Sequence, residues 1–462
     1  MTWIKKHLYF LPVFLYLPAM FNYFSSDDWF HLRISQISTF SEFLNFFSFH
    51  HTSQSAAFYR PLPTQVFFFI FQNTFGLIVW PYYLFVLFCF GFSLYLVYKF
   101  ALTFFKSEEK SILAAIIYGI SVSNFTRVYF LSAFQEVSLV IFSILCLLSY
   151  KKSKFKSLIL FILALMSKET AIVIPAIILL LNFKTILKSV KVFLPFVFTS
   201  LIYLYLRFFI FGVVEGDSYL WNFSPVKATN TLLWYTLWSF GAPELLVDYI
   251  GNGFKPIPRL FSDYPYWWQA IFTLLFGTLI SFALLATNKI RKIDKTLLKS
   301  ISIFLITLSP VLFLPHHKFT LELGLPLVGF SLAIAWLLPQ KGSVLKTIFI
   351  SFFVILNISM NYLTFTRHYS VNRSKISKSV VNFLNENYHQ YPTESYFEFI
   401  NDSGDYGEEW GQSKQIAQTL SNSDFFKVYY KDPSLKVYYE DNEEDRPDNQ
   451  KPINLSSKQF IH

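Results

Sequence analysis

Two adjacent carboxylates, Asp27 and Asp28, stand at the end of the first membrane-length apolar run. A bilayer solvates charge poorly, so a pair of acids at this boundary must face water, a cation or a substrate. A carboxylate that faces a substrate can act as a general base, which removes a proton from a reacting hydroxyl group. The alternative is a solvated helix end that marks the membrane edge.

A second charged motif, Ser167-Lys168-Glu169-Thr170, interrupts the apolar run 157–181. Two charges in the middle of a membrane-length run are costly in lipid, so the motif predicts two short helices that meet at an aqueous pocket. The alternative is that Lys168 and Glu169 neutralise each other as a structural ion pair.

The composition indicates which elements must position these residues. Of the 462 residues, 53% are apolar and 21% aromatic, whereas only 15% are charged. Soluble domains contain about 25% charged residues, so we expect an all-α polytopic membrane domain over residues 1–365. The net charge of +10 comes from short basic clusters between apolar runs, which argues against a nucleic-acid partner.

The apolar runs give the predicted membrane segments. With the interrupted run counted as two, we expect about eleven segments, from the runs 8–24, 81–105, 111–124, 133–150, 157–181, 192–212, 267–287, 298–314, 321–339 and 345–364. Basic residues gather at 5–6, 106–110, 151–156, 184–191, 289–299 and 341–346. Because Lys and Arg concentrate in cytoplasmic loops, we expect a multi-pass plasma-membrane protein with a cytoplasmic N-terminus and an extracytoplasmic C-terminus.

The predicted outer loops, 25–80 and 213–266, carry few basic residues and are expected to be ordered. Residues 64–78 suit a helix that lies at the membrane surface, and residues 228–268 combine interfacial Trp side chains with turn-forming Gly and Pro. Large ordered loops on the outer side indicate a site at the outer leaflet.

The remainder of the chain differs in character. Residues 366–440 are expected to form a small extracytoplasmic α+β domain, with helical spacing at 374–390 and 412–420 and strand-like patterns at 395–400, 425–430 and 435–439. The acidic, polar residues 441–462 are expected to be a disordered tail.

Four features, in this order along the chain, resemble the GT-C glycosyltransferases that use polyprenyl-phosphate sugars. They are the acidic pair, Tyr59-Arg60-Pro61-Leu62, the Ser-Lys-Glu-Thr motif followed by Pro175, and Pro315-His-His-Lys-Phe followed by Pro326-Leu-Val-Gly329. The similar proteins include protein O-mannosyltransferases, bacterial aminoarabinose transferases and mannosyltransferases that continue into tetratricopeptide repeats. The resemblance covers roughly residues 8–340.

The resemblance implies a GT-C-like fold and a donor sugar on a long lipid phosphate, whose head group lies at the outer leaflet. It also implies transfer with inversion and a first-loop carboxylate that acts on the acceptor, which maps to Asp27 and Asp28. The family's second carboxylate maps to Glu136, although Phe134 replaces the Arg that usually precedes it. The family's Arg-Tyr-x-Tyr-x-Pro stretch is replaced by a segment that begins at Lys318 and keeps only the basic group.

The chemistry of such a transfer needs a base for the acceptor hydroxyl and cations for the departing phosphate. We therefore expect three catalytic carboxylates, four residues that bind the donor phosphate and two further pocket residues. The catalytic carboxylates are Asp27, Asp28 and Glu136. The residues that bind the donor phosphate are Arg60, Lys168, His317 and Lys318, and the further pocket residues are Tyr59 and Glu169. No metal-ligand spacing is present and no cofactor is assigned, although oligosaccharyl relatives hold a divalent cation. The acceptor is a protein, a lipid or a glycan.

Several alternatives stay open at this stage. A secondary transporter also places charges inside a broken span, and a glycan ligase or polymerase would use a pyrophosphate-linked donor. A non-catalytic membrane scaffold would merely display the C-terminal domain. For single residues, Arg60 is alternatively a lipid-headgroup anchor, Glu136 a helix-start carboxylate, and His317 part of a polar turn.

Overall fold

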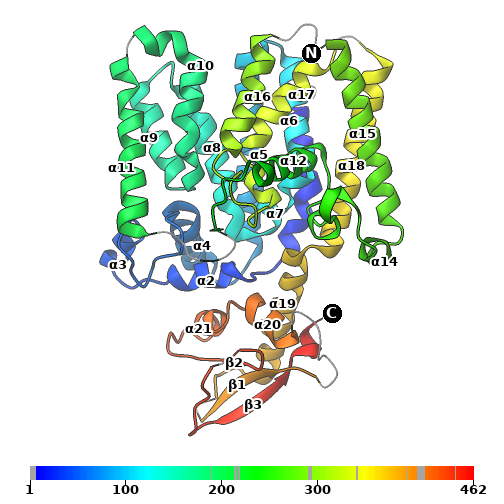
Figure 1. Ribbon diagram of the computed structural model, residues 1–462. Helices are drawn as coiled ribbons and strands as arrows, with labels where there is room; N and C mark the ends of the chain where they lie inside the picture. Colours follow the sequence, from blue (N-terminus) through cyan, green and yellow to red (C-terminus); the bar gives the residue numbers. More distant parts are fainter. Residues whose placement is uncertain are drawn as a thin grey trace.

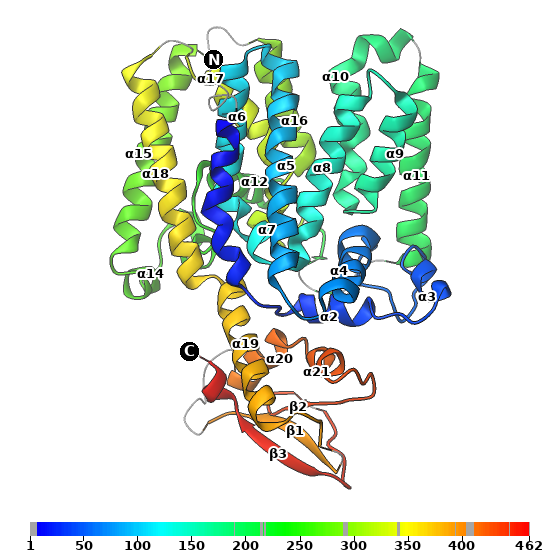
Figure 2. The same cartoon turned by 180° about the vertical axis from the view of Figure 1, so that it is seen from behind.

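The computed structural model describes residues 7–188, 190–212, 216, 219–289, 294–339, 342–392, 394–402, 411–442 and 444–461. Within these residues, a bundle of helices carries a small C-terminal domain at one end, and the N-terminal helix begins toward the other end (Figures 1 and 2). Parts of the predicted later outer loop and of the predicted basic clusters lie outside the described residues, namely 1–6, 189, 213–215, 217–218, 290–293 and 340–341.

The helical bundle follows the apolar runs of the sequence. Its elements are η1 (Leu8–Phe21), α2 (Asp27–Ile34), α3 (Phe40–Asn45), η2 (Leu62–Val66), α4 (Phe67–Phe75), α5 (Trp80–Phe105), α6 (Glu108–Ile120), η3 (Val122–Asn124), α7 (Phe125–Tyr129), η4 (Leu131–Ala133), α8 (Phe134–Ser149), α9 (Lys154–Leu165), η5 (Glu169–Val173), α10 (Ile174–Lys188), η6 (Val190–Val192), α11 (Leu194–Tyr205), η7 (Leu206–Phe211), α12 (Pro225–Phe240), α13 (Leu246–Tyr249), η9 (Asn252–Phe254), α14 (Arg259–Asp263), α15 (Trp267–Lys289), α16 (Lys295–Leu308), η11 (Thr320–Leu323), α17 (Pro326–Leu337) and α18 (Val344–Arg367).

Several helices are long and apolar enough to cross a membrane, as predicted. Among the described residues there are six such candidates, or seven if α6 and the helix after it, which are bent by 60°, form one broken span. They comprise Trp80–Phe105, Leu131–Ser149, Glu169–Lys188, Leu194–Phe211, Trp267–Thr287 and Val344–Asn387, with Glu108–Ile120 plus Val122–Tyr129 as the bent pair. The predicted count of about eleven is therefore not confirmed.

The difference in count comes from helix length rather than from missing helices. Each predicted run contains a helix, but η1 has 14 residues and includes two prolines, α16 has 14, and α17 has 12. A membrane-crossing helix needs about 20 residues, so these shorter helices do not meet the criterion alone. The predicted break in the run 157–181 is present, since α9 ends at Leu165 and the next helical turn starts at Glu169.

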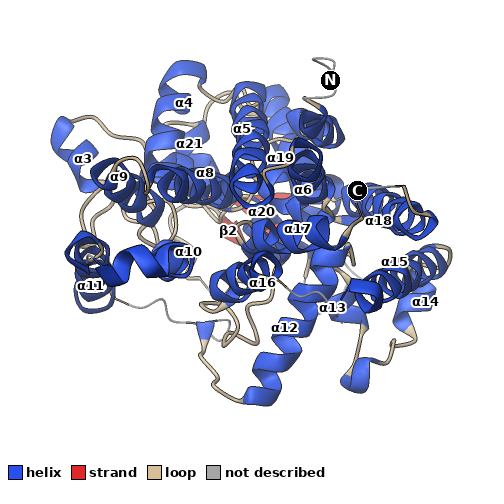
Figure 3. Ribbon diagram, turned by 90° about the horizontal axis from the view of Figure 1, so that it is seen from above, coloured by secondary structure: helices blue, strands red, loops and turns tan. Residues whose placement is uncertain are grey.

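The helices form three groups when seen along the bundle axis (Figure 3). Helices α9, α10 and α11 lie on one side, α15 and α18 pack together on the other, and α5, α6, α8, α16 and α17 lie between them. Helices α16 and α17 approach closely at Gly329, where an added Cβ would lie 2.8 Å from the Ser300 carbonyl oxygen. Many large apolar side chains on the outer helices are exposed, including Phe183, Phe198 and Phe276, as expected for surfaces that contact lipid.

The C-terminal domain is an α+β structure, as predicted. It consists of α19 (Tyr369–Asn387), β1 (Ser395–Ile400), α20 (Gln412–Thr419), α21 (Asp424–Tyr429), β2 (Tyr438–Tyr439), β3 (Lys451–Ser456) and η12 (Ser457–Phe460). The strands form a parallel sheet in the order β2-β1-β3, in which Phe399 pairs with Tyr439 on one side and with Leu455 on the other.

Two predictions for this domain are wrong. Residues 425–430 belong to helix α21 rather than to a strand, because Phe425, Phe426 and Val428 are buried on one side of a short helix. The tail 441–462 is not disordered along its length, since β3 pairs with β1 over six residues and Phe460 is buried in the domain core. The apolar side chains of β3 are few, and pairing with a distant strand supplies the rest of its stabilisation.

Candidate functional site

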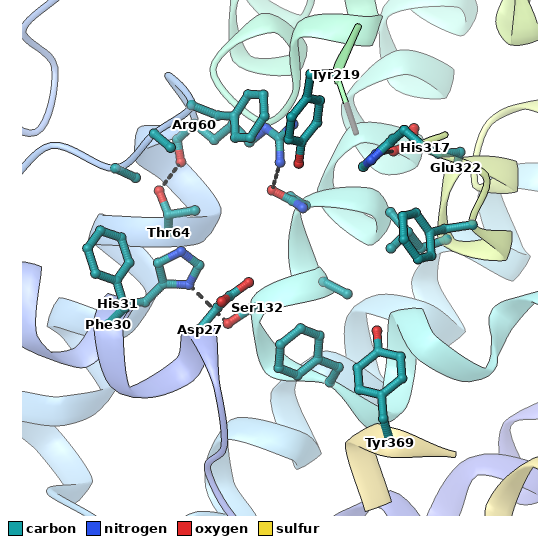
Figure 4. A pocket seen from close by; sticks show the side chains of 18 residues that line it. Asp27, Phe30, His31, Arg60, Thr64, Ser132, Tyr219, His317, Glu322 and Tyr369 are labelled. Carbon is teal, nitrogen blue, oxygen red and sulfur yellow. Dashed lines mark hydrogen bonds and ion pairs between the residues drawn. The ribbon is translucent and has the colours of Figure 1, made fainter. Parts of the chain in front are cut away.

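Two neighbouring cavities lie between the segment 25–80, the η4–α8 and η5–η7 regions, and the loops before α12 and α17. The first, here called the polar cavity, has a volume of about 320 Å³ (Figure 4). Its lining residues are Asp27, Phe30, His31, Ala56, Ala57, Phe58, Arg60, Thr64, Phe130, Ser132, Ala133, Gln135, Tyr219, His317, Phe319, Leu321, Glu322 and Tyr369. Figure 4 shows Asp27 and His31 across this cavity from His317 and Glu322.

The second cavity, here called the apolar cavity, has a volume of about 260 Å³ and is walled mainly by aliphatic and aromatic side chains. It is lined by Phe58, Arg60, Lys168, Glu169, Thr170, Ile172, Tyr203, Leu204, Arg207, Phe208, Tyr219, Trp221, Pro310, Val311, Leu314, His317 and Glu322. The two cavities share Phe58, Arg60, Tyr219, His317 and Glu322. A polar compartment and an apolar compartment therefore meet at a charged wall.

Asp27 is the first residue of α2, and its side chain faces the polar cavity. Among the described residues, its carboxylate has no hydrogen-bond or ion-pair partner, so it is free to receive a proton. Burial of the surrounding site raises the pKa of Asp27 above its ordinary value, while the positive charges of Arg373 and Arg60 oppose this effect. A raised pKa makes a carboxylate a stronger base.

Asp28 occupies a different environment from its neighbour. Its carboxylate is fully buried and accepts hydrogen bonds from the backbone N–H of Ser25 at 3.1 Å, the backbone N–H of Ser132 at 2.9 Å and the Ser132 hydroxyl at 2.6 Å. Burial raises the pKa of Asp28 to about 7, against the effect of these hydrogen bonds. Asp28 therefore ties α2 to η4 instead of lining the described walls of either cavity.

His31, one helical turn after Asp28, was not expected at the site. It lines the polar cavity, and its Nδ1 lies 3.1 Å from the Ser132 hydroxyl. Burial, helped by the charge of Arg60, lowers the pKa of His31 to about 3, so its imidazole is neutral. The available signal in the sequence was its position four residues after Asp27 and three after Asp28, which puts the three side chains within one turn of a helix.

Arg60 lies on the wall that the two cavities share. Its guanidinium donates to Glu169 through Nε at 2.8 Å and Nη2 at 2.5 Å, and to the Gln135 side chain through Nη1 at 2.6 Å. It also lies 4.1 Å from the centroid of the Phe58 ring. The loop of Arg60 is thereby fixed to η5 and α8, and the cation faces both compartments.

The structural alternative for Lys168, an ion pair with Glu169, is not what the structure shows. The buried ammonium group of Lys168 forms ion pairs with Glu136 and with Glu322, the latter at 2.7 Å. The other carboxylate oxygen of Glu322 lies 3.4 Å from Nε2 of His317. Glu136 therefore lies in a buried ion pair and is not among the described lining residues of either cavity. Glu322, which the sequence analysis did not select, contacts both.

The remaining predicted site residues are split between the cavities and their surroundings. His317 lines both cavities, and Glu169 lines the apolar cavity. Lys318 instead donates to the Asn230 side chain at 3.2 Å, and Tyr59 stacks on Phe49 with a centroid distance of 3.8 Å. Neither of these two residues belongs to the described walls of the cavities.

Three further residues of the cavity walls were not predicted as site residues. Arg207 of η7 lines the apolar cavity and, among the described residues, has no carboxylate within ion-pair distance. Tyr219 belongs to both walls, and Tyr369 reaches the polar cavity from the first turn of α19. Tyr369 lies in the C-terminal domain, where no local pattern pointed to a site.

The arrangement combines the free carboxylate of Asp27, the cation of Arg60 at the boundary between the cavities and an apolar chamber. Within the described part of the chain, no group of three or more His, Cys, Asp or Glu side chains is placed to hold a metal ion. Comparison with protein-family models finds no match to this chain, and comparison with curated proteins finds no significant match.

Proposed function

We propose that the protein is a membrane glycosyltransferase that moves a sugar from a polyprenyl-phosphate donor to an acceptor hydroxyl group. The observation that carries the proposal is the pair of adjoining cavities: an apolar one that Arg207 also lines, a polar one with the free carboxylate of Asp27, and the guanidinium of Arg60 on the wall between them. A lipid-linked sugar has the same order of parts, with an apolar chain, an anionic phosphate and a polar sugar.

The donor would lie across the shared wall. Its lipid chain enters the apolar cavity among Leu204, Phe208 and Leu314, and its sugar occupies the polar cavity. Arg60 and Arg207 supply positive charge near the phosphate between them, where hydrogen bonds from guanidinium groups to phosphate are strong. Lys168 acts less directly, since two carboxylates already enclose its ammonium group.

The proposed reaction is a single displacement. Asp27 removes the proton of the acceptor hydroxyl as its oxygen attacks the anomeric carbon of the sugar. The bond between that carbon and the phosphate oxygen breaks, and the lipid phosphate leaves with both bonding electrons. The anomeric configuration inverts, the proton stays on Asp27, and the charge that develops on the phosphate is stabilised by Arg60 on the shared wall and by Arg207 in the apolar cavity.

The site is proposed to face the outer side of a plasma membrane. Helices α2, α3 and α4 and the C-terminal domain lie at the same end of the bundle, away from the N-terminal helix start (Figures 1 and 2). The basic clusters of the sequence support a cytoplasmic N-terminus, which puts Asp27 and the C-terminal domain outside.

The test is transfer by purified protein in lipid nanodiscs from a panel of labelled polyprenyl-phosphate sugars to peptide, lipid and glycan acceptors. Asp27→Asn should lower the rate by about 10²–10⁴-fold without changing donor binding, because only the base is lost. Asp263→Asn is the matched control, since Asp263 is an acid of the later outer loop that lies on α14 and pairs with Arg259.

Three results would contradict the proposal. Transfer at the parental rate by the Asp27→Asn protein would remove the base from the mechanism. Transfer only from pyrophosphate-linked donors would favour a glycan ligase or polymerase. No transfer from any donor, together with uptake of labelled solute into vesicles, would favour a transporter.

A further inference from the structure

Helix α2, which begins at Asp27, is packed directly against the C-terminal domain. The indole N–H of Trp29 donates to the Ser377 hydroxyl at 3.0 Å, and the Trp29 ring meets the Phe425 ring at a centroid distance of 4.7 Å. At the other end of the helix, Arg33 forms an ion pair with Asp424 at 2.5 Å. Figure 2 shows α2 directly above α20 and α21. The helix that carries the candidate base Asp27 therefore contacts α19 and α21 of the C-terminal domain, which lie far from it in the sequence.

The residue before Asp27 has an unusual backbone. Ser26 has φ 52° and ψ −127°, a conformation that residues with a side chain seldom adopt. Such a conformation persists only where the surrounding structure holds it, and strained residues cluster at functional sites.

The C-terminal domain supplies the contacts that hold Ser26. The Ser26 N–H donates to the Thr419 carbonyl oxygen at 2.6 Å, at the end of α20, where helix carbonyl groups lack partners within the helix. Arg373 of α19 donates to the Ser26 hydroxyl at 3.2 Å and to the Gln418 side chain at 2.6 Å. One guanidinium group thus joins the strained residue to the end of α20.

Arg373 also contributes charge to the polar cavity. Its guanidinium lies 5.1 Å from the ring centroid of Tyr369, which lines that cavity. The charged and titratable groups that face Asp27 come from its own helix, from α19, from the loop before η2 and from the opposite wall of the cavity. They are Asp28 and His31, Arg373 and Tyr369, Arg60, and His317 and Glu322. Arg373 favours the ionised form of Asp27, which is the form a base requires.

We propose that the C-terminal domain completes the candidate active site, with Arg373 as a positioning residue that holds Ser26 and thereby orients Asp27 toward the polar cavity. The catalytic consequence rests on the proposed function, whereas the positioning itself does not. The domain is then part of the enzyme's working site rather than an appendage that could be removed without effect.

The experiment compares full-length Arg373→Gln, Arg373→Lys and Arg33→Gln proteins. Arg33→Gln is the matched control because it also breaks a contact between α2 and the C-terminal domain, at the end of the helix away from Asp27. We expect Arg373→Gln to lower kcat at least about tenfold with little change in the KM for the donor, because a misplaced group loses its reacting geometry. The control should stay within about twofold of the parental rate.

The pH profile of kcat separates the effect of the Arg373 charge on Asp27 from the effect of the hydrogen bonds that Arg373 donates. Loss of the Arg373 charge raises the pKa of Asp27, so the acid limb of the kcat profile should move to higher pH in Arg373→Gln. Arg373→Lys keeps the charge and should leave the limb at its parental pH, even if its rate falls. Equal losses of kcat in Arg373→Gln and Arg33→Gln, with no movement of the limb, would overturn the proposal.

Hydrogen–deuterium exchange tests the positioning without any enzymatic assay. The amides at the start of α2 should exchange faster in Arg373→Gln than in the parent, while Arg33→Gln should affect only the end of that helix. If the parental protein transfers no sugar, the proposed function fails and the exchange data alone decide the positioning. Unchanged protection at Ser26 in Arg373→Gln would then refute it.

Discussion

Replacement of Asp28 by Asn should change the stability of the protein with opposite signs at acid and alkaline pH. Asp28 is fully buried and accepts three hydrogen bonds, two from Ser132 and one from the N–H of Ser25. An Asn side chain can keep its oxygen toward Ser132, but its NH₂ group then faces the Ser25 donor. One buried donor loses its acceptor, which costs about 1–3 kcal/mol.

The ionisation of Asp28 works in the other direction. Burial raises its pKa from 3.8 to about 7, so the folded protein binds the proton more tightly than the unfolded chain does. The stability that this group contributes is complete below about pH 4 and is lost as the pH rises through about 7. The pKa difference corresponds to about 4 kcal/mol, which the parental protein loses over this interval and the Asn protein does not.

The two effects predict a crossover. At about pH 4 the Asn protein should be less stable than the parent by about 1–3 kcal/mol, and at about pH 8 it should be equally or more stable. Calorimetric unfolding midpoints of the detergent-solubilised proteins, measured across this range, provide the test. Asp263→Asn removes a partly exposed carboxylate whose pKa is lowered by its hydrogen bond from Tyr249, so its stability difference from the parent should not change sign between about pH 4 and about pH 8. A constant difference between the Asn protein and the parent at every pH would refute the reasoning.

Two further predictions concern the charged wall and the topology. Arg60→Gln leaves Glu169 without its bidentate partner, so it should lower the free energy of unfolding by about 1–3 kcal/mol and raise the KM for the donor. Adding Glu169→Gln should restore the stability but not the donor affinity. A double variant with parental donor kinetics would assign Arg60 a structural role only. Alkaline phosphatase is active only outside the cytoplasm, so a fusion after Asn387 should be active and a fusion at Lys154 should be inactive. The reverse pattern would put the candidate site in the cytoplasm.

The membrane helices could be predicted from the sequence because hydropathy acts locally. A span must be apolar along its own length and must satisfy its backbone internally, so composition alone shows where helices form. The break at Ser167 was predictable for the same reason, since two adjacent charges cannot lie within lipid. Helix length was not predictable at this level: η1 ends at Phe21, before the end of its apolar run, and α17 begins only at Pro326, several residues into its run.

In the C-terminal domain, the sequence predicted only those elements whose own residues show a clear helical or strand periodicity. The strand at 395–400 and the helix at 412–419 matched their local periodicity. The segment 425–430 did not, because a short apolar run suits a helix or a strand equally and packing decides between them. Strand β3 was missed because its stability comes from pairing with β1, more than fifty residues earlier in the chain.

The sequence by itself identified the residue types of the candidate site, since charged side chains beside apolar runs stand out without any knowledge of the fold. Only the tertiary structure assigned their environments: Asp27 faces a cavity while Asp28 is buried, Arg60 rather than Lys168 pairs with Glu169, and Lys168 is enclosed by carboxylates from two distant segments. The physical reason is that ion pairing and burial depend on distances between segments that are remote in the chain. Local sequence shows which groups carry charge, whereas the packing of helices determines which charges meet.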